Sequence, residues 1–120
     1  MPRNPLTPPT VHLSMYRQRP GKRYATIKAY IRRNKKSIKF LTSDINAPSD
    51  LLQRFDYRGE LKPGEVAPKW LQEDIRRFYT CAQTIGLTQI ELGKFDTMPS
   101  QEISDMVRDL YFHTTEKERG

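Results

Sequence analysis

Residues 24–33 are predicted as a strand because residues 24–32 alternate apolar and polar side chains with a strict period of two, and this pattern constrains the fold more than any other feature. A period of two is typical of a β-strand with one buried face and one solvent face. The apolar face is predicted to carry Ala25, Ile27, Ala29 and Ile31. The polar face is predicted to carry Tyr24, Thr26, Lys28, Tyr30 and Arg32.

Two further alternating stretches predict a strand on each side of this one. In the earlier stretch, Val11, Leu13 and Met15 alternate with His12, Ser14 and Tyr16. In the later stretch, Ile38 and Phe40 are predicted on the apolar face, with Ser37 and Lys39 on the polar face. Residues 19–22 read Arg-Pro-Gly-Lys, which suits a type II turn between the first two strands.

The second and third strands are predicted to form a hairpin whose two-residue loop is Asn34-Lys35. The predicted partners are Arg33 with Lys36, Arg32 with Ser37, Ile31 with Ile38, Tyr30 with Lys39 and Ala29 with Phe40. This register puts apolar side chains opposite apolar ones, and a slip of one residue would destroy the match.

The remainder of the chain predicts loop followed by helix. Residues 46–67 contain several prolines and glycines and are predicted as mostly loop, with a short turn packed on the core through Leu51, Leu52 and Phe55. A long helix is predicted from near Pro68 to a stop at Gly86, with its apolar stripe formed by Leu71, Ile75, Phe78, Ala82 and Ile85. A second, short helix is predicted from near Ser100, with Glu102 in its first turn and an apolar face of Ile103, Val107, Leu110 and Tyr111.

These elements predict an α+β fold in which a three-stranded antiparallel sheet packs on a long helix that a second short helix follows. A chain of 120 residues has room for one such domain. Residues 1–10 contain four prolines and are predicted as a flexible arm, residues 11–112 as the folded domain, and residues 113–120 as a frayed charged tail.

Charge is strongly segregated along the chain. Residues 1–43 contain eleven Lys or Arg and no acid, whereas residues 44–120 contain ten basic and fourteen acidic residues. This asymmetry, within a net charge of +7, predicts that the first third binds a polyanion. No stretch is apolar and long enough to cross a membrane, and the single cysteine, Cys81, indicates a cytoplasmic protein without an internal disulfide.

The sequence predicts a binding module and not an enzyme. His12 and His113 lie at opposite ends of the chain, and Cys81 falls beside the apolar stripe of the long helix, where a buried cysteine packs as a small hydrophobic residue. No spacing resembles a zinc site, a phosphate-binding loop or a calcium loop, so neither metal nor cofactor is expected.

The polar face of the sheet is the predicted binding site. Its side chains are Tyr16, Tyr24, Thr26, Lys28, Tyr30, Arg32 and Lys39. Basic residues at the turns and strand ends add Arg19, Lys22, Arg23, Arg33, Lys35 and Lys36. A narrow sheet fits the major groove of DNA, where Arg and Lys reach guanine edges and basic turns lie near phosphates.

The order of these elements resembles the N-terminal arm-type DNA-binding domain of tyrosine recombinases, the integrases of phages and Bacteroidetes mobile elements. The resemblance covers about residues 11–112 and rests on "YATIKAYIRRNKKSIKF", "INAP", "WLQEDIRRFY" and "PSQEISDMV" in that order. It implies that Tyr24, Lys28, Tyr30, Arg32 and Lys39 contact arm-type DNA sites. It also implies recombinase protomers or domains as partners and a catalytic domain that lies outside this chain, which is then a fragment or a stand-alone relative.

Two alternatives to duplex DNA binding follow from the same residues. The basic sheet suits RNA, with tyrosines stacked on bases. The helical half suits a protein-interaction module that docks another protein or a second copy.

Overall fold

The computed structural model describes residues 10–14, 24–33 and 38–119. The strands are β1 (Thr10–Ser14), β2 (Tyr24–Arg32) and β3 (Ile38–Pro48), and the helices are α1 (Ser49–Leu52), α2 (Lys69–Glu91) and α3 (Ser100–Arg119). The strands form one antiparallel sheet in the order β1-β2-β3. The predicted α+β fold, with a three-stranded sheet followed by helices, is therefore confirmed.

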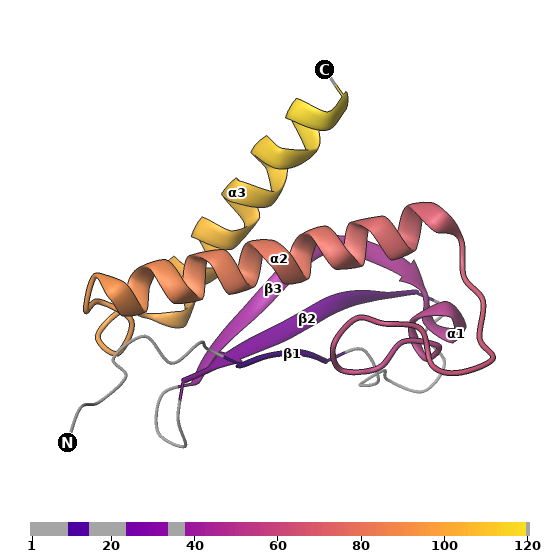
Figure 1. Cartoon of the computed structure of the whole chain (residues 1–120), viewed down its shortest axis with the longest axis horizontal. Coiled ribbons are helices and arrows are strands. Elements are labelled where there is room, and N and C mark those ends of the chain that lie inside the picture. Colours follow the sequence, from indigo (N-terminus) through magenta and orange to yellow (C-terminus); the bar gives the residue numbers. More distant parts are fainter. Residues whose placement is uncertain (1–9, 15–23, 34–37, 120) are drawn as a thin grey trace.

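The helices lie on one face of the sheet, and the hydrophobic core lies between the two layers. Figure 1 shows α2 extended over the sheet, while α3 turns away from it toward the C-terminus. α2 contacts all three strands, and α3 packs on β3 and α2. The buried apolar side chains from the sheet are Val11, Ile27, Ala29, Ile31, Leu41, Ile45 and Ala47, and those from the helices include Leu52, Leu71, Ile75, Phe78, Ala82, Ile103 and Val107.

The predicted hairpin register is wrong by one residue. The structure pairs Arg32 with Ile38, Ile31 with Lys39, Tyr30 with Phe40 and Ala29 with Leu41. Phe40 therefore lies on the face away from the core, where its side chain is 65% exposed, and Lys39 lies on the helix side. The proposed loop residues Asn34 and Lys35 fall outside the described residues, as do the Pro-rich arm and the turn at residues 19–22.

The length of β3 explains the error. The strand has eleven residues, and its buried positions are Leu41, Ser43, Ile45 and Ala47. These four positions decide which face of the strand meets the core, against the two apolar residues at its start, Ile38 and Phe40. The alternation of these buried positions is not apparent in the sequence, because Ser43 has a polar side chain. Its hydroxyl donates a hydrogen bond to the Ile27 carbonyl (2.6 Å), so the group is satisfied within the core.

An irregularity in the β2–β3 pairing leaves the two faces of the sheet intact. Lys28 pairs with Thr42, but Thr26 pairs with Asn46, so β3 contains two extra residues between these pairs. Because side chains alternate with a period of two, an insertion of two residues returns each strand to the same face. Even-numbered residues of β1, β2 and β3 therefore share the face opposite the helices.

Both helices are longer than the sequence predicts. α2 continues through the buried Gly86 to Glu91, and the stop is Gly93, whose φ of 70° is in the left-handed region. The Gly93 and Lys94 amides donate to the carbonyls of Ile90 (3.0 Å) and Gln89 (2.9 Å), which is a Schellman cap. α3 has 20 residues and is not a short helix.

α3 runs along β3 and binds its free edge through side chains four residues apart. The Phe40 amide donates to Ser100 Oγ (3.1 Å), and the Thr42 amide donates to Ser104 Oγ (3.1 Å). Four residues of helix rise about 6 Å and two residues of strand about 6.7 Å, so the two repeats match. Arg108 extends the series by an ion pair with Asp44 (2.8 Å). We call these contacts the edge ladder.

Candidate nucleic-acid interface

The sheet face opposite the helices, which we call the open face, is the most distinctive surface of the described structure. Its described side chains are His12, Tyr24, Thr26, Lys28, Tyr30, Arg32, Ile38, Phe40, Thr42, Asp44 and Asn46. Figure 1 shows that α2 and α3 lie on the other side of the sheet. Two of its aromatic side chains are mostly exposed, namely Tyr24 (62%) and Phe40 (65%).

An aromatic row crosses the open face at right angles to the strands, because His12, Tyr30 and Phe40 are direct cross-strand neighbours. The rings of His12 and Tyr30 stack with centroids 5.0 Å apart and planes 6° apart. The rings of Tyr30 and Phe40 are 6.3 Å apart and tilted by 55°. Tyr57 extends the row beyond β1, with its ring 5.0 Å from that of His12.

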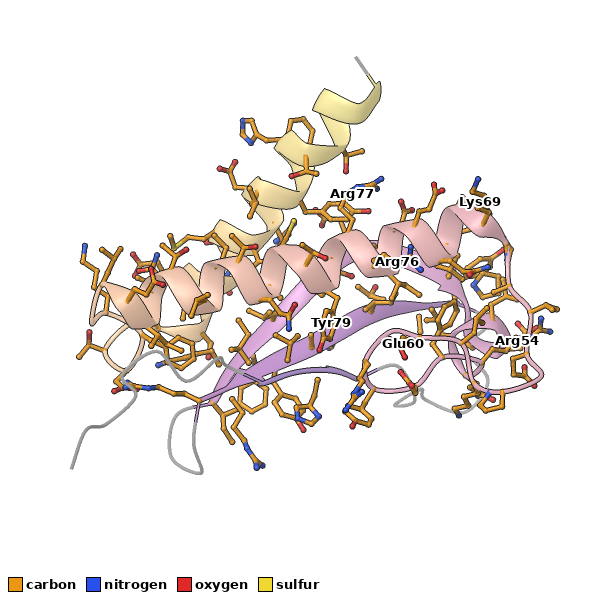
Figure 2. All side chains as sticks on the ribbon, viewed as in Figure 1. Arg54, Glu60, Lys69, Arg76, Arg77 and Tyr79 are labelled. Carbon is orange, nitrogen blue, oxygen red and sulfur yellow. The ribbon has the colours of Figure 1, made fainter. Side chains whose placement is uncertain are left out.

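A structured loop holds Tyr57 beside His12. Phe55 is buried and forms an isolated antiparallel bridge with Leu61. Between them, one carboxylate oxygen of Asp56 accepts hydrogen bonds from the amides of Arg58 (2.8 Å) and Glu60 (3.0 Å). Figure 2 shows Tyr79 pointing from α2 toward the part of this loop that carries Glu60. The loop is thereby fixed at both ends to the core layer.

Stacking across strands determines which part of each ring meets a partner. Rings that stack on one another turn their faces together, so His12, Tyr30 and Tyr57 offer a partner their ring edges and not the stacked faces. Such a surface offers hydrogen bonds and apolar contact to groups that lie above the sheet. Only the rings at the margins, such as Phe40 and Tyr24, keep a free face.

Two basic side chains flank the aromatic row along β2. Arg32 lies two residues to one side of Tyr30 and Lys28 two residues to the other, and both are exposed. Each is therefore about 7 Å from the row. Within the part of the chain that the structure describes, no carboxylate forms an ion pair with either of them.

The structure separates the predicted site residues into three groups. Tyr24, Thr26, Lys28, Tyr30 and Arg32 lie on the open face, as the alternation predicts, with Thr26 and Tyr30 partly buried. Arg33 and Lys39 are directed to the helix side. Tyr16, Arg19, Lys22, Arg23, Lys35 and Lys36 fall in segments that the structure does not describe.

Arg33 and Lys39 both bind the connection between α2 and α3. Arg33 forms an ion pair with Asp96 (2.9 Å). The Lys39 ammonium donates to the Asp96 carbonyl (3.3 Å) and lies 5.6 Å from the centre of the Phe95 ring. The predicted position of Lys39 on the polar face is therefore wrong, for the same reason as the register.

Three aromatic side chains of the row, those of His12, Phe40 and Tyr57, are not among the predicted site residues. The sequence places His12 on the correct face, but no motif marks it. Phe40 is missed because the apolar pair at the start of β3 indicates the opposite face. Tyr57 comes from a loop whose position depends on tertiary contacts, so no local signal identifies it.

The position of His12 in the aromatic row affects its protonation. Partial burial lowers the pKa of the imidazole below its ordinary value of about 6.5, and the nearby positive charge of Arg32 lowers this pKa further. The imidazole is therefore mostly neutral at pH 7 and adds little to the positive charge of Lys28 and Arg32.

The helical layer contains a cavity of about 580 Å³ between α2 and α3. Its lining includes Arg76, Arg77, Thr80, Cys81 and Thr114. Cys81 is buried, as predicted, and burial raises the pKa of its thiol, which disfavours the nucleophilic thiolate. Among the described side chains, no group of three His, Cys, Asp or Glu is placed to hold a metal ion.

Comparisons with models of protein families, with curated proteins and with solved structures find no match to this chain. Within the described ranges, no helix has the length and apolar character required to cross a membrane.

Proposed function

We propose that the chain binds duplex DNA through the open face, as an arm-site-binding module of the kind that it resembles in tyrosine recombinases. The observation that carries the proposal is the pair of exposed cations, Lys28 and Arg32, on each side of a row of ring edges, neither of them in an ion pair with a described carboxylate. Arg and Lys read guanine edges in the major groove and also bind phosphates.

The width of the sheet supports this choice. The outer backbones of three strands are about 10 Å apart, and the major groove is about 12 Å wide. The ring edges of the aromatic row would then meet base edges, because both project into the groove. Single-stranded RNA is less well matched, since its bases stack on exposed ring faces and three of the four rings here stack on each other.

By the same proposal, this module positions a recombinase on arm-type sites and does not cleave DNA itself. Strand cleavage belongs to a catalytic domain that the resemblance places outside residues 1–120. The expected partners are duplex DNA and the other domains or protomers of that recombinase, in the cytoplasm. No metal or cofactor enters this binding reaction.

The experiment is a titration of duplex DNA, duplex RNA and single strands at 50 and 200 mM salt. If the basic third of the chain neutralises roughly six phosphates, affinity for duplex DNA falls by about a thousandfold between these concentrations. A flat salt dependence, or a preference for RNA, contradicts the proposal.

Variants then locate the contact. On a duplex selected from a random pool, Arg32→Ala is expected to cost about 1–3 kcal/mol of binding free energy, and far less on random DNA. The matched control is Lys69→Ala, which also removes one positive charge but lies at the start of α2 in the helical layer (Figure 2). Equal losses of affinity for the two variants would show that the binding is non-specific electrostatic attraction.

A further inference from the structure

Phe40 is an apolar side chain at the β3 margin of a charged, hydrogen-bonding surface. Its neighbour Leu41 is 2% exposed, whereas the Phe40 ring is 65% exposed. A single exposed ring needs no explanation on most surfaces. Here, however, the ring continues the row of His12 and Tyr30 and lies on the same face as Lys28 and Arg32.

The fold holds Phe40 firmly in this position. Its backbone pairs with Tyr30 on β2, and its amide donates to Ser100 Oγ (3.1 Å) on α3. The strand is thus bound on both sides at this residue. A ring on a fixed backbone loses little freedom when a partner covers it, so the apolar contact that it makes is not offset by ordering of the chain.

The major groove offers one apolar substituent for such a ring. Base edges there present hydrogen-bond donors and acceptors, and thymine adds its 5-methyl group, which proteins contact with apolar side chains including Phe. The Tyr30 hydroxyl, beside Phe40, can serve the polar atoms of the same base pair.

We infer that Phe40, supported by Tyr30, contacts a thymine 5-methyl group and makes the site selective for A·T at that position. This inference rests on the proposed function, because it requires the open face to enter the major groove. The discrimination between base pairs at this position then comes from an apolar residue, because charge alone does not provide it.

The test replaces thymine by uracil. A duplex enriched by selection from a random pool is synthesised again with each deoxythymidine changed, one at a time, to deoxyuridine. The change removes the methyl group and keeps every hydrogen-bonding atom. At one position the wild-type affinity should fall about three- to fivefold, the effect of one buried methyl group.

Phe40→Ala should bind the thymine duplex more weakly than the wild type does. The variant should also bind the thymine duplex and the uracil duplex with the same affinity. Phe112→Ala is the matched control, because it removes an exposed ring from α3 and should leave the thymine-to-uracil ratio at the wild-type value. Thermal melting checks that both variants fold. No loss of stability is expected, because both rings are mostly exposed.

Three results would overturn the inference. They are a selection that enriches no sequence, equal wild-type affinity for every uracil duplex, and a Phe40→Ala variant that keeps the wild-type ratio. Failure of the proposed function differs from each of these outcomes, since it appears as no salt-dependent binding to any duplex DNA.

Discussion

His12 lies between the rings of Tyr30 and Tyr57 and close to Arg32. Burial and the neighbouring cation both disfavour the imidazolium, so the folded protein has a lower histidine pKa than the unfolded chain. The unfolded chain therefore binds more protons as the pH falls through about 6.5. It follows that this residue makes no contribution to pH dependence well above 6.5 and reduces stability progressively below it.

We predict that wild-type protein loses more unfolding free energy between pH 7.5 and pH 5.5 than His12→Phe does. Phenylalanine keeps an aromatic ring in the row but cannot accept a proton. Urea unfolding at a series of pH values measures the difference, and other titrating groups cancel because they are common to both proteins. Equal slopes for the two proteins would show that the environment of His12 does not disfavour its charged form.

At the scale of the elements, the edge ladder explains how α3 is attached. Edge strands present unpaired amides that invite pairing with another chain, and proteins commonly cover them. In this protein the serine hydroxyls of α3 take the place of a fourth strand at Phe40 and Thr42. The helix thereby protects the edge of β3 and leaves the open face uncovered.

We predict that Ser104→Ala destabilises the protein by about 1–3 kcal/mol, because it leaves the partly buried Thr42 amide without an acceptor. Ser100→Ala removes the equivalent bond at an exposed position, where water can replace it, and should cost less than about 1 kcal/mol. Urea unfolding measures both losses of stability, from the shift of the unfolding midpoint at an unchanged m-value. Equal costs for the two substitutions would contradict the role of burial in the edge ladder.

Local sequence patterns predict those elements whose signal is continuous. The alternation of β2 is uninterrupted, so both of its faces are predicted correctly. The stripe of α2 likewise predicts the burial of Leu71, Ile75 and Phe78. The predicted turn at residues 51–55 is confirmed as α1 and the residues after it, with Leu52 and Phe55 buried.

The pattern fails where tertiary contacts decide the outcome. The face of β3 depends on Ser43, whose hydroxyl is satisfied by a bond to Ile27 that no local pattern shows. Gly86 suggests a helix end, but Gln89 and Ile90 are buried after it and hold α2 to the core as far as its cap. The sequence does not predict the aromatic row as a unit for the same reason, because the row joins side chains from three strands and a loop.

At the scale of the whole molecule, the ion pairs that join the two layers lie apart from the proposed binding surface. Two ion pairs join the layers at the border of the sheet: Asp96, in the connection between α2 and α3, pairs with Arg33, and Asp44 on β3 pairs with Arg108 on α3. These pairs join the layers at half-exposed positions, where each contributes at most about 1 kcal/mol. Lys28 and Arg32 remain exposed on the open face, so the proposed binding surface is separate from these ion pairs.

Three phenylalanines test this separation with one type of substitution. Phe78 is 1% exposed and contacts Tyr111 across the α2–α3 boundary, with ring centroids 6.3 Å apart. Phe78→Ala should therefore destabilise the protein by about 3–5 kcal/mol, a large part of the stability of a small domain. Phe112 is 59% exposed, and Phe112→Ala should change stability by less than about 0.5 kcal/mol.

Phe40→Ala should resemble Phe112→Ala in stability and differ from it in DNA binding. Circular dichroism during urea unfolding gives the stability of each variant, and duplex titration under native conditions gives the affinity. Phe78→Ala should bind normally at temperatures where it remains folded, since its ring lies in the core and not on the open face. If Phe78→Ala unfolds at the wild-type midpoint, the layers do not meet at this residue. If Phe40→Ala is destabilised as strongly as Phe78→Ala, the ring belongs to the core, and the open face is not the separate binding surface inferred from its exposure.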